Sequence, residues 1–267
     1  MPALIFDLDE TLILEHDAVK AAFEETCLAA ALKHKLDVLH LAATVRHRGR
    51  ELWHRSPAYA WCLAIGISSW EGLSGDLGGA SPELAALRDW AEQSRFRATA
   101  WTQALAEFGV DDVGLAAELA ARLVQVRRRY HIPYPETETV LTALRGGYRL
   151  ALLTNGAPRL QREKITALGL AKYFDAIVIS GEVGLGKPDP RVFELVLDQL
   201  GAAAEESAMV GDSLQHDIAG ANATGLRSIW LNRTGRQPRS DVRPDMTVTA
   251  LDELLERPVL PGERAHT

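Results

Sequence analysis

The sequence predicts an α/β protein: a parallel sheet covered by helices on both faces and interrupted near its start by an all-helical insert. Three observations support this fold class. A short apolar run opens the chain, helical periodicity covers about residues 17–129, and short apolar runs then alternate with amphipathic segments from residue 136 onward. Strands and helices that alternate at this interval are typical of βαβ units, whose strands form a parallel sheet.

The apolar run Ala3–Phe6 contains no charge and is predicted to be a buried strand of this sheet. Asp7 and Asp9 follow it directly, and side chains two residues apart on an extended backbone point to the same side. Parallel sheets bind ligands at the carboxyl ends of their strands. Two carboxylates this close favour a cation between them, and Mg²⁺ prefers oxygen ligands. A solvent-exposed acidic turn is the alternative interpretation.

The insert begins with apolar residues that recur at helical spacing, with charged residues between them. Further along, Ser81 and Pro82 are typical of a helix start. This helix is predicted to continue toward Phe108 and to end at Gly109. Because this helical spacing of apolar residues extends over the whole region, we expect amphipathic helices that pack on one another.

A further helix, Val113–Arg129, completes the insert. We therefore expect a helical domain over residues 16–133, placed between two parts of a core, residues 1–15 and 134–267. The insert also contains a run with four glycines, Gly72–Gly79. Its aromatic side chains are Trp53, His54, Tyr59, Trp61 and Trp70. A substrate wall and a lid loop are possible roles for these features, but a packed core and a simple link are the favoured interpretation.

After residue 135 the predicted elements alternate. The expected strands are Tyr148–Leu153, Ala176–Ser180, Ala208–Val210, Arg227–Leu231 and, at the sheet edge, Met246–Val248. The expected helices are Glu136–Arg145, Arg159–Leu168, Arg191–Leu200 and Leu251–Leu255. The last several residues are expected to be frayed. The first strand belongs to the same sheet, although the insert separates it from the others.

Polar residues follow three more of these strands. Thr154 and Asn155 offer a hydroxyl and backbone amides, which are donors for phosphoryl oxygens. Lys187, in a loop with glycines and prolines, offers a cation. Asp212 is placed to complete a metal site with Asp7, and Asp217 could hold a metal-bound water or fix Lys187. Each motif alone has a structural interpretation: a turn, a surface lysine, or the capped start of a helix.

Composition narrows the class of function. The 267-residue chain has a formal net charge of −7, which argues against nucleic-acid binding as its main task. Its two cysteines, Cys27 and Cys62, show no zinc-site or disulfide spacing, which fits a reducing compartment. We expect a cytoplasmic protein without a signal peptide or membrane span, because no basic segment with a long apolar run is found.

The ordered motifs resemble those of the haloacid dehalogenase-like (HAD) hydrolase superfamily, in its phosphatase branch. All four motifs of that family occur in order, each at a predicted strand end or in the loop that follows. They are Asp7-Leu8-Asp9-Glu10-Thr11, Thr154-Asn155-Gly156, Lys187-Pro188, and Gly211-Asp212 through Asp217. The resemblance covers residues 1 to about 15 and about 134 to 235. It implies a Rossmann-like, doubly wound core with an inserted helical cap.

The resemblance also implies roles for these residues. Asp7 would be a nucleophile that forms an aspartyl-phosphate, and Asp9 would be the general acid and base. Mg²⁺ would be held by Asp7, the backbone carbonyl of Asp9 and Asp212, with Asp217 close to it. Thr154, Asn155 and Lys187 would hold the phosphoryl oxygens. The acid at position 9 separates phosphatases from true dehalogenases of the superfamily, because an alkoxide leaving group needs a proton and a halide does not.

These inferences predict a magnesium-dependent phosphatase acting on a small phosphorylated metabolite, such as a nucleotide or a sugar or acid phosphate. A phosphomutase and a haloacid dehalogenase are the alternatives within the superfamily, the latter opposed by Asp9. A catalytically idle phosphate-binding regulatory protein is the alternative outside enzymes. Neither a nucleic-acid polymer nor a membrane is expected as a partner. The sequence leaves open whether the chain is a monomer or a homodimer.

Overall fold

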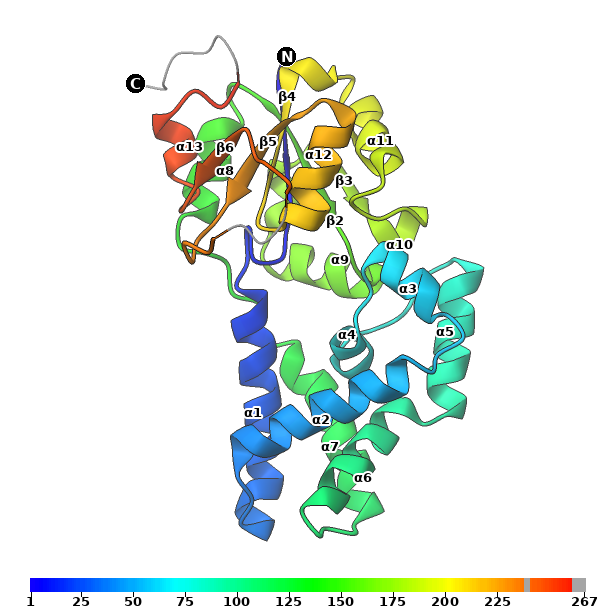
Figure 1. The fold of residues 1–267 in the computed structure, drawn as a ribbon. Helices are drawn as coiled ribbons and strands as arrows, with labels where there is room; N and C mark the ends of the chain where they lie inside the picture. The colour runs from blue at the N-terminus through cyan, green and yellow to red at the C-terminus, as the bar shows by residue number, and fades with distance from the viewer. Residues whose placement is uncertain (238–240, 261–267) are drawn as a thin grey trace. The chain divides into compact units, whose positions relative to one another are not determined.

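The structure, a computed structural model, describes residues 1–237 and 241–260. The chain forms two compact units, each described here by itself (Figure 1). The sheet unit comprises residues 1–14, 132–155 and the described residues from 165 onward, and the helical unit comprises residues 15–131 and 156–164. The expected fraying of the last residues concerns 261–267, which lie outside the described part of the chain.

The sheet unit contains a parallel sheet of six strands in the order β3-β2-β1-β4-β5-β6. The strands are β1 Ala3–Phe6, β2 Arg149–Thr154, β3 Ala176–Ile179, β4 Ser207–Gly211, β5 Arg227–Leu231 and β6 Met246–Val248. The predicted parallel sheet is confirmed, and β6 is its edge strand as expected. Because β1 pairs with both β2 and β4, the first strand lies in the middle of the sheet. Residue Ser180, expected to end a strand, instead begins a short helix.

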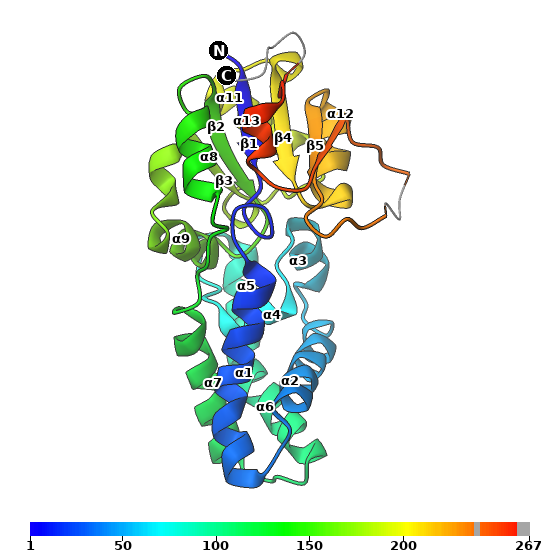
Figure 2. The ribbon, with the colours of Figure 1, turned by 90° about the vertical axis from the view of Figure 1, so that its left-hand side faces the viewer.

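Helices cover both faces of this sheet. Alternate residues of β1 point to opposite faces. Leu4 and Phe6 pack with α8 (Thr137–Leu144) and α13 (Glu253–Glu256), whereas Ala3 and Ile5 pack with α11 (Pro190–Leu200) and α12 (Ala219–Thr224). Figure 2 shows α8 and α13 in front of the strands. The helical segments of this unit are α8 Thr137–Leu144, η1 Leu170–Tyr173, α10 Ser180–Val183, α11 Pro190–Leu200, η2 Ala204–Glu206, η3 Leu214–Ile218, α12 Ala219–Thr224 and α13 Glu253–Glu256. The doubly wound α/β arrangement is therefore confirmed.

The helical unit contains α1 Glu15–His34, α2 Val38–Trp53, α3 Tyr59–Ile65, α4 Ser69–Ser74, α5 Pro82–Gln93, α6 Phe96–Glu107 and α7 Val113–Arg127. Most of α9, Pro158–Ala167, belongs to it as well. The side chains of Phe23, Leu41, Trp53 and Trp101 are buried in its core. Trp53 packs against the rings of Trp90 and Phe96. It is therefore a core residue, in agreement with the favoured interpretation of the aromatic side chains.

One prediction within the helical unit is wrong. The single helix expected from Pro82 to Phe108 is two helices, α5 and α6. Arg95, between them, has φ 48° and adopts the left-handed conformation, which ends α5 and redirects the chain. The predicted start is correct, because the Ser81 hydroxyl accepts a hydrogen bond from the Leu84 amide and Pro82 is the first helical residue.

No helix in the described part of the chain is both long and apolar enough to cross a bilayer. Cys27 and Cys62 are both buried and both free, as expected from their spacing.

Candidate active site

The register of three strands brings the predicted motifs to one edge of the sheet. Phe6 is paired with Leu152 on one side and with Val210 on the other. Asp7, the next residue, donates its backbone N–H to the Val210 carbonyl at 3.0 Å. Thr154 lies two residues after Leu152, at the end of β2, and Asp212 lies two residues after Val210, just beyond β4. The carboxyl ends of adjacent parallel strands therefore place these side chains around Asp7.

Lys187 lies in the loop between α10 and α11, and its ammonium reaches this edge. Its Nζ lies 2.6 Å from Oδ1 of Asp7 and 2.7 Å from Oδ1 of Asp217, and it also donates to the Leu153 carbonyl at 2.8 Å. Lys187 and both carboxylates are buried. A buried ammonium needs such partners, because taking a charge out of water costs several kcal/mol. The surface-lysine interpretation of Lys187 is therefore wrong.

Asp217 is fixed by the turn that follows β4. Its second oxygen accepts the Ser213 backbone N–H at 2.9 Å. A Cβ atom on Gly211 would lie 2.2 Å from Oδ2 of Asp217, so only glycine allows this close approach. Asp217 is thus held against the end of β4, where it faces Lys187.

Asp9 lies in a tight turn that follows the first strand. The amides of Leu12 and Ile13 both donate to the Leu8 carbonyl, at 2.9 and 3.1 Å. Within this turn, the Thr11 hydroxyl donates a 3.0 Å hydrogen bond to Oδ2 of Asp7. Asp7 is therefore oriented from two sides, by the Lys187 ammonium and by the Thr11 hydroxyl.

Asn155 connects two of the predicted motifs. Its carboxamide makes two hydrogen bonds with the backbone of Lys187: Nδ2 donates to the carbonyl, and Oδ1 accepts the N–H, both at 2.9 Å. Thr154 is buried at the end of β2, beside Asn155. These contacts make Asn155 a residue that positions the Lys187 loop. Its predicted contact with phosphate stays a prediction.

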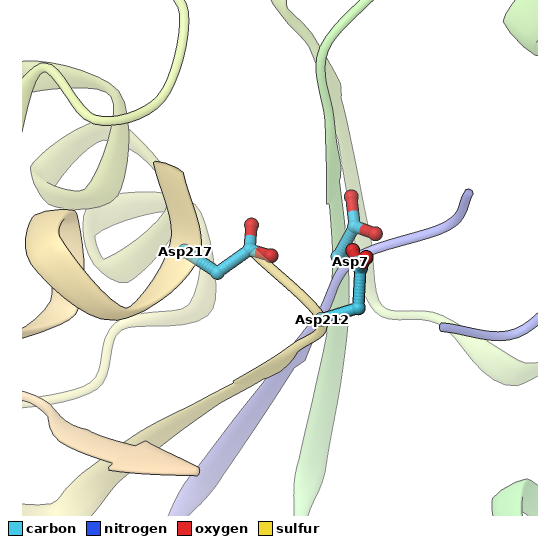
Figure 3. Close-up of side chains that lie close together, drawn as sticks. All are labelled: Asp7, Asp212 and Asp217. Carbon is cyan, nitrogen blue, oxygen red and sulfur yellow. The ribbon is translucent and has the colours of Figure 1, made fainter. Parts of the chain in front are cut away.

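Three carboxylates form an acidic cluster at this edge, drawn in Figure 3. Each of Asp7, Asp212 and Asp217 offers an oxygen atom within 4.8 Å of the others. Among the described residues this cluster does not include the Asp9 side chain. Asp212 is partly exposed, whereas Asp7 and Asp217 are buried. Their oxygens are hard ligands at a spacing that a divalent cation could bridge.

The electrostatics of this cluster favour a bound cation. Burial raises the pKa of Asp7 to about 7, against the lowering effect of Lys187, and the charges of Asp217 and Asp9 raise it further. Burial and the charge of Asp7 raise the pKa of Asp212 to about 8. Burial alone would lower the pKa of Lys187, but the carboxylates of Asp217 and Asp7 outweigh it and raise that pKa. A divalent cation would stabilise the ionised acids, so the donor set fits Mg²⁺.

Thr11 belongs to the first motif, but its hydrogen bond to the Asp7 carboxylate does not follow from the sequence pattern. Sequence reasoning missed one further residue that holds this edge in place. Arg233, after β5, donates to the Thr11 carbonyl at 3.1 Å and to Glu136 at 2.6 Å, and it lies 3.4 Å from the centroid of the Tyr134 ring. No local sequence pattern marks Arg233, because all its partners are far away in the chain.

Comparisons with known proteins agree with this geometry. The family model for haloacid dehalogenase-like hydrolases matches residues 1–225. The chain is similar to phosphoserine phosphatase of Thermus thermophilus, with 42% identity over 255 residues, covering 95% of this chain and 98% of that one. It is also similar to N-acylneuraminate-9-phosphatase of Mus musculus, with 40% identity over 162 residues, covering 59% of this chain and 65% of that one.

The fold also matches a solved structure. A HAD-hydrolase from Bacillus subtilis bound to magnesium has a TM-score of 0.65 and 20% identity to this chain, covering 95% of this chain and 96% of that one. At this identity the likeness concerns the fold alone. The family match and the similarity to the Thermus thermophilus phosphatase show that the chain belongs to the haloacid dehalogenase-like hydrolases. Within that family it is a phosphoric monoester hydrolase.

Proposed function

We propose that this chain hydrolyses the phosphate monoester of a small metabolite, with magnesium at the acidic cluster and Asp7 as the nucleophile. The observation that carries the proposal is the position of Asp7: it is buried at the centre of the sheet edge, 2.6 Å from the Lys187 ammonium. Phosphoryl transfer depends mainly on positioning and on neutralising charge. A carboxylate held by Thr11 and Lys187 beside two further acids meets both needs.

The proposed reaction has two steps. An Asp7 oxygen attacks phosphorus, the bond from phosphorus to the substrate oxygen breaks, and Asp9 gives its proton to that oxygen. Asp9 then takes a proton from water, which attacks phosphorus, and the aspartyl-phosphate breaks to phosphate and free Asp7. Lys187 and Thr154 hold the phosphoryl oxygens in both steps. Mg²⁺, held by Asp7, the Asp9 carbonyl and Asp212, would supply neutralising positive charge.

The nucleophile can be identified chemically. Acid quenching during turnover of phosphoserine, followed by borohydride reduction, should convert a phosphorylated Asp7 to homoserine, which mass spectrometry of the amino-terminal peptide detects. The Asp7→Asn variant should release no phosphate and give no homoserine. Asp198→Asn, an exposed acid on α11, is the matched control and should behave as the parent chain does. Normal turnover by Asp7→Asn would refute the proposed nucleophile.

The role of Asp9 has a different signature. Loss of the proton donor slows the departure of a poor leaving group more than that of a good one. Asp9→Asn should slow release of an alkyl alcohol by about 10²- to 10⁴-fold. Formation of the aspartyl-phosphate from 4-nitrophenyl phosphate, followed as the nitrophenolate burst, should slow much less. Equal slowing of both substrates would contradict the general-acid role.

The metal is tested by binding as well as by activity. Calorimetric titration of Mg²⁺ into the chelator-treated protein should show one site, lost in Asp212→Asn and kept in Asp198→Asn. Chelation should stop phosphate release, and Mg²⁺ should restore it. Unchanged Mg²⁺ binding by Asp212→Asn would remove Asp212 from the site.

We further propose phosphoserine as the first substrate to test. The support is the Thermus thermophilus phosphoserine phosphatase, whose similarity extends over nearly all of both chains. Phosphate release should be compared for phosphoserine, a sugar-acid phosphate, a pyrimidine nucleotide and 4-nitrophenyl phosphate. A preference for another ester would reject this substrate and leave the hydrolase proposal intact. Phosphate formed in proportion to the substrate consumed would exclude a phosphomutase.

The helical insert, expected at residues 16–133, is proposed to act as a cap that selects the substrate. This proposal rests on the family resemblance and on the insertion of these residues between two parts of the sheet unit. Exchange with the insert of a phosphatase that has another substrate should change the ratios of kcat/KM. The exchange should include residues 156–164, because they pack with the helical unit. An unchanged substrate preference would contradict this role.

A further inference from the structure

The helical unit contains a cavity of about 500 Å³ between α5, α6, α7 and the Gly75–Leu77 segment. We call it the arginine pocket. It is lined by four arginines, Arg88, Arg95, Arg97 and Arg128, and by two acids, Asp76 and Glu92. The proposed catalytic residues are all in the sheet unit, so this cavity is a separate feature. Its volume falls within the range of small-molecule sites.

The charge of the arginine pocket is opposite to that of the protein. The chain carries a net charge of −7, yet cations outnumber acids four to two around this cavity. Asp76 is already engaged, since it accepts the Gly78 N–H at 2.7 Å and lies 3.4 Å from Arg159. Arg128 is engaged as well, since its Nε lies 3.3 Å from Glu163. The other charged residues of the lining are three arginines and one acid. The pocket is therefore a local positive site on an acidic protein, and it attracts anions.

Arg97 provides the most specific part of this site. Its guanidinium donates to the Gly72 carbonyl at 2.9 Å and also to the Gly75 carbonyl. These acceptors are neutral, and among the described residues Arg97 forms no ion pair. Burial lowers the pKa of Arg97 more than the nearby charge of Asp76 raises it, and the charge of Arg128 lowers it further. An anion in the cavity would add to the stabilisation of this charge and would suit the planar guanidinium fork.

The pocket lining also includes apolar residues, most of them small. They are five alanines on α5, α6 and α7, together with Leu77 and Val124. Ala120 is buried, whereas Ala117 and Ala121 are exposed, so the cavity opens to solvent along α7. These apolar side chains fit an aliphatic body. The cavity thus combines arginines with small apolar side chains in one lining.

We propose that the arginine pocket binds a small organic anion, with its charged end at Arg97 and a short apolar body on the alanines. The charged end is a carboxylate or a phosphate monoester, because both match the geometry of arginine. The site does not depend on the proposed phosphatase reaction. A ligand bound here would be recognised by the helical unit alone.

Calorimetric titration of the full chain tests the proposal. The probes are hexanoate and hexyl phosphate, with hexan-1-ol as the uncharged control and with acetate and inorganic phosphate as headgroups without a body. Hexyl phosphate is titrated into Asp7→Asn so that it is not hydrolysed. At least one hexyl anion should bind with one-to-one stoichiometry, more tightly than its headgroup alone, and hexan-1-ol should not bind. The two anions distinguish a carboxylate site from a phosphate site.

Two variants assign the binding to the pocket. Ala121→Leu should fill the cavity and weaken binding of the hexyl anion by about tenfold or more. Ala86→Leu is the matched control, because Ala86 is exposed on α5 and does not line the cavity, and it should leave binding unchanged. Arg97→Gln should also weaken binding by about tenfold. Binding of neither anion would overturn the proposal, as would equal binding by Ala121→Leu and Ala86→Leu.

Discussion

The Lys187 ammonium lies 2.6 Å from the Asp7 carboxylate, although the two residues are 180 positions apart in the chain. Asp217 faces the same ammonium at 2.7 Å, so a single cation stands between two buried acids. This arrangement joins three of the sequence motifs into one charged group. Such a group is costly to break, because the loss of one partner leaves the others buried and uncompensated.

Lys187→Met should therefore destabilise the fold as well as stop turnover. Removal of the ammonium leaves Asp7 and Asp217 facing each other without their cation, and we expect a loss of about 3–5 kcal/mol in the free energy of unfolding. Urea unfolding in the presence of a chelator measures this loss without metal rescue. Lys172→Met, which removes an exposed partner of Glu138, should leave the free energy of unfolding almost unchanged. Equal stability of the two variants would contradict the buried charge group.

The sheet and the edge of the site could be predicted because their signals are local. An uncharged apolar run followed at once by polar residues marks both the strand and its carboxyl end, as for Ala3–Phe6 and Asp7. Once the strands are parallel, their ends must share one edge. The positions of Thr154 and Asp212 near Asp7 could therefore be predicted without knowledge of the individual contacts.

Other features could not be predicted, because their causes lie far away in the chain. The left-handed Arg95 interrupts a periodic helical pattern that continues on both sides of it. The use of Asn155 as a clamp on Lys187 depends on two loops that meet only in the folded sheet. Arg233 and its partners likewise share no sequence pattern. Local periodicity carries no information about such tertiary contacts.

The helical unit has a buried charge group of its own, which gives a second prediction. Arg127 donates to both oxygens of Glu15, at 2.8 and 2.6 Å, and Lys164 lies 3.0 Å from the same carboxylate. Glu15→Gln leaves these two buried cations without that charge and should cost about 3–5 kcal/mol of unfolding free energy. Glu51→Gln, in a solvent-accessible pair with Arg48, should cost much less, because water screens this pair. A difference smaller than about 1 kcal/mol between the two variants would show that the charge of Glu15 is not needed.

The segment after the Thr-Asn motif gives a third prediction. Gly156 has φ 143°, and a Cβ atom there would lie 2.8 Å from a Glu71 carboxylate oxygen. That oxygen accepts the Ala157 N–H at 3.0 Å, and the other accepts the Ser68 N–H at 2.6 Å. Gly156→Ala should therefore strain the backbone and disturb Glu71, at a cost of about 1–3 kcal/mol.

Gly146→Ala is the matched control for this substitution. No atom lies within 4 Å of the Cβ position at Gly146, and its φ is not in the left-handed region. Urea unfolding of the two variants should thus separate the effect of the close contact from that of an added methyl group. If Gly156→Ala were as stable as Gly146→Ala, the contact with Glu71 would not restrict this position.

The two buried thiols give a fourth prediction, on alkaline pH. Burial raises the pKa of Cys27 from 9.0 to about 12, and burial with the charge of Glu71 does the same for Cys62. Between these values the unfolded chain loses thiol protons that the folded chain keeps. The contribution of the two protonated thiols to the free energy of unfolding is fully present below pH 9.0. It is lost as the pH rises toward about 12. The slope approaches about 1.4 kcal/mol per pH unit for each thiol.

The double variant Cys27→Ala/Cys62→Ala isolates this effect. It is expected to be less stable at neutral pH, because two buried side chains become smaller, but its stability should fall less steeply above about pH 9. Burial raises the pKa of Tyr134 to about 12 as well. Because Tyr134 is present in both proteins, its ionisation does not contribute to the difference between their slopes. Urea unfolding at several pH values between about 8 and 10.5 gives the two slopes. Parallel slopes would mean that the thiols are not protected from ionisation in the folded chain.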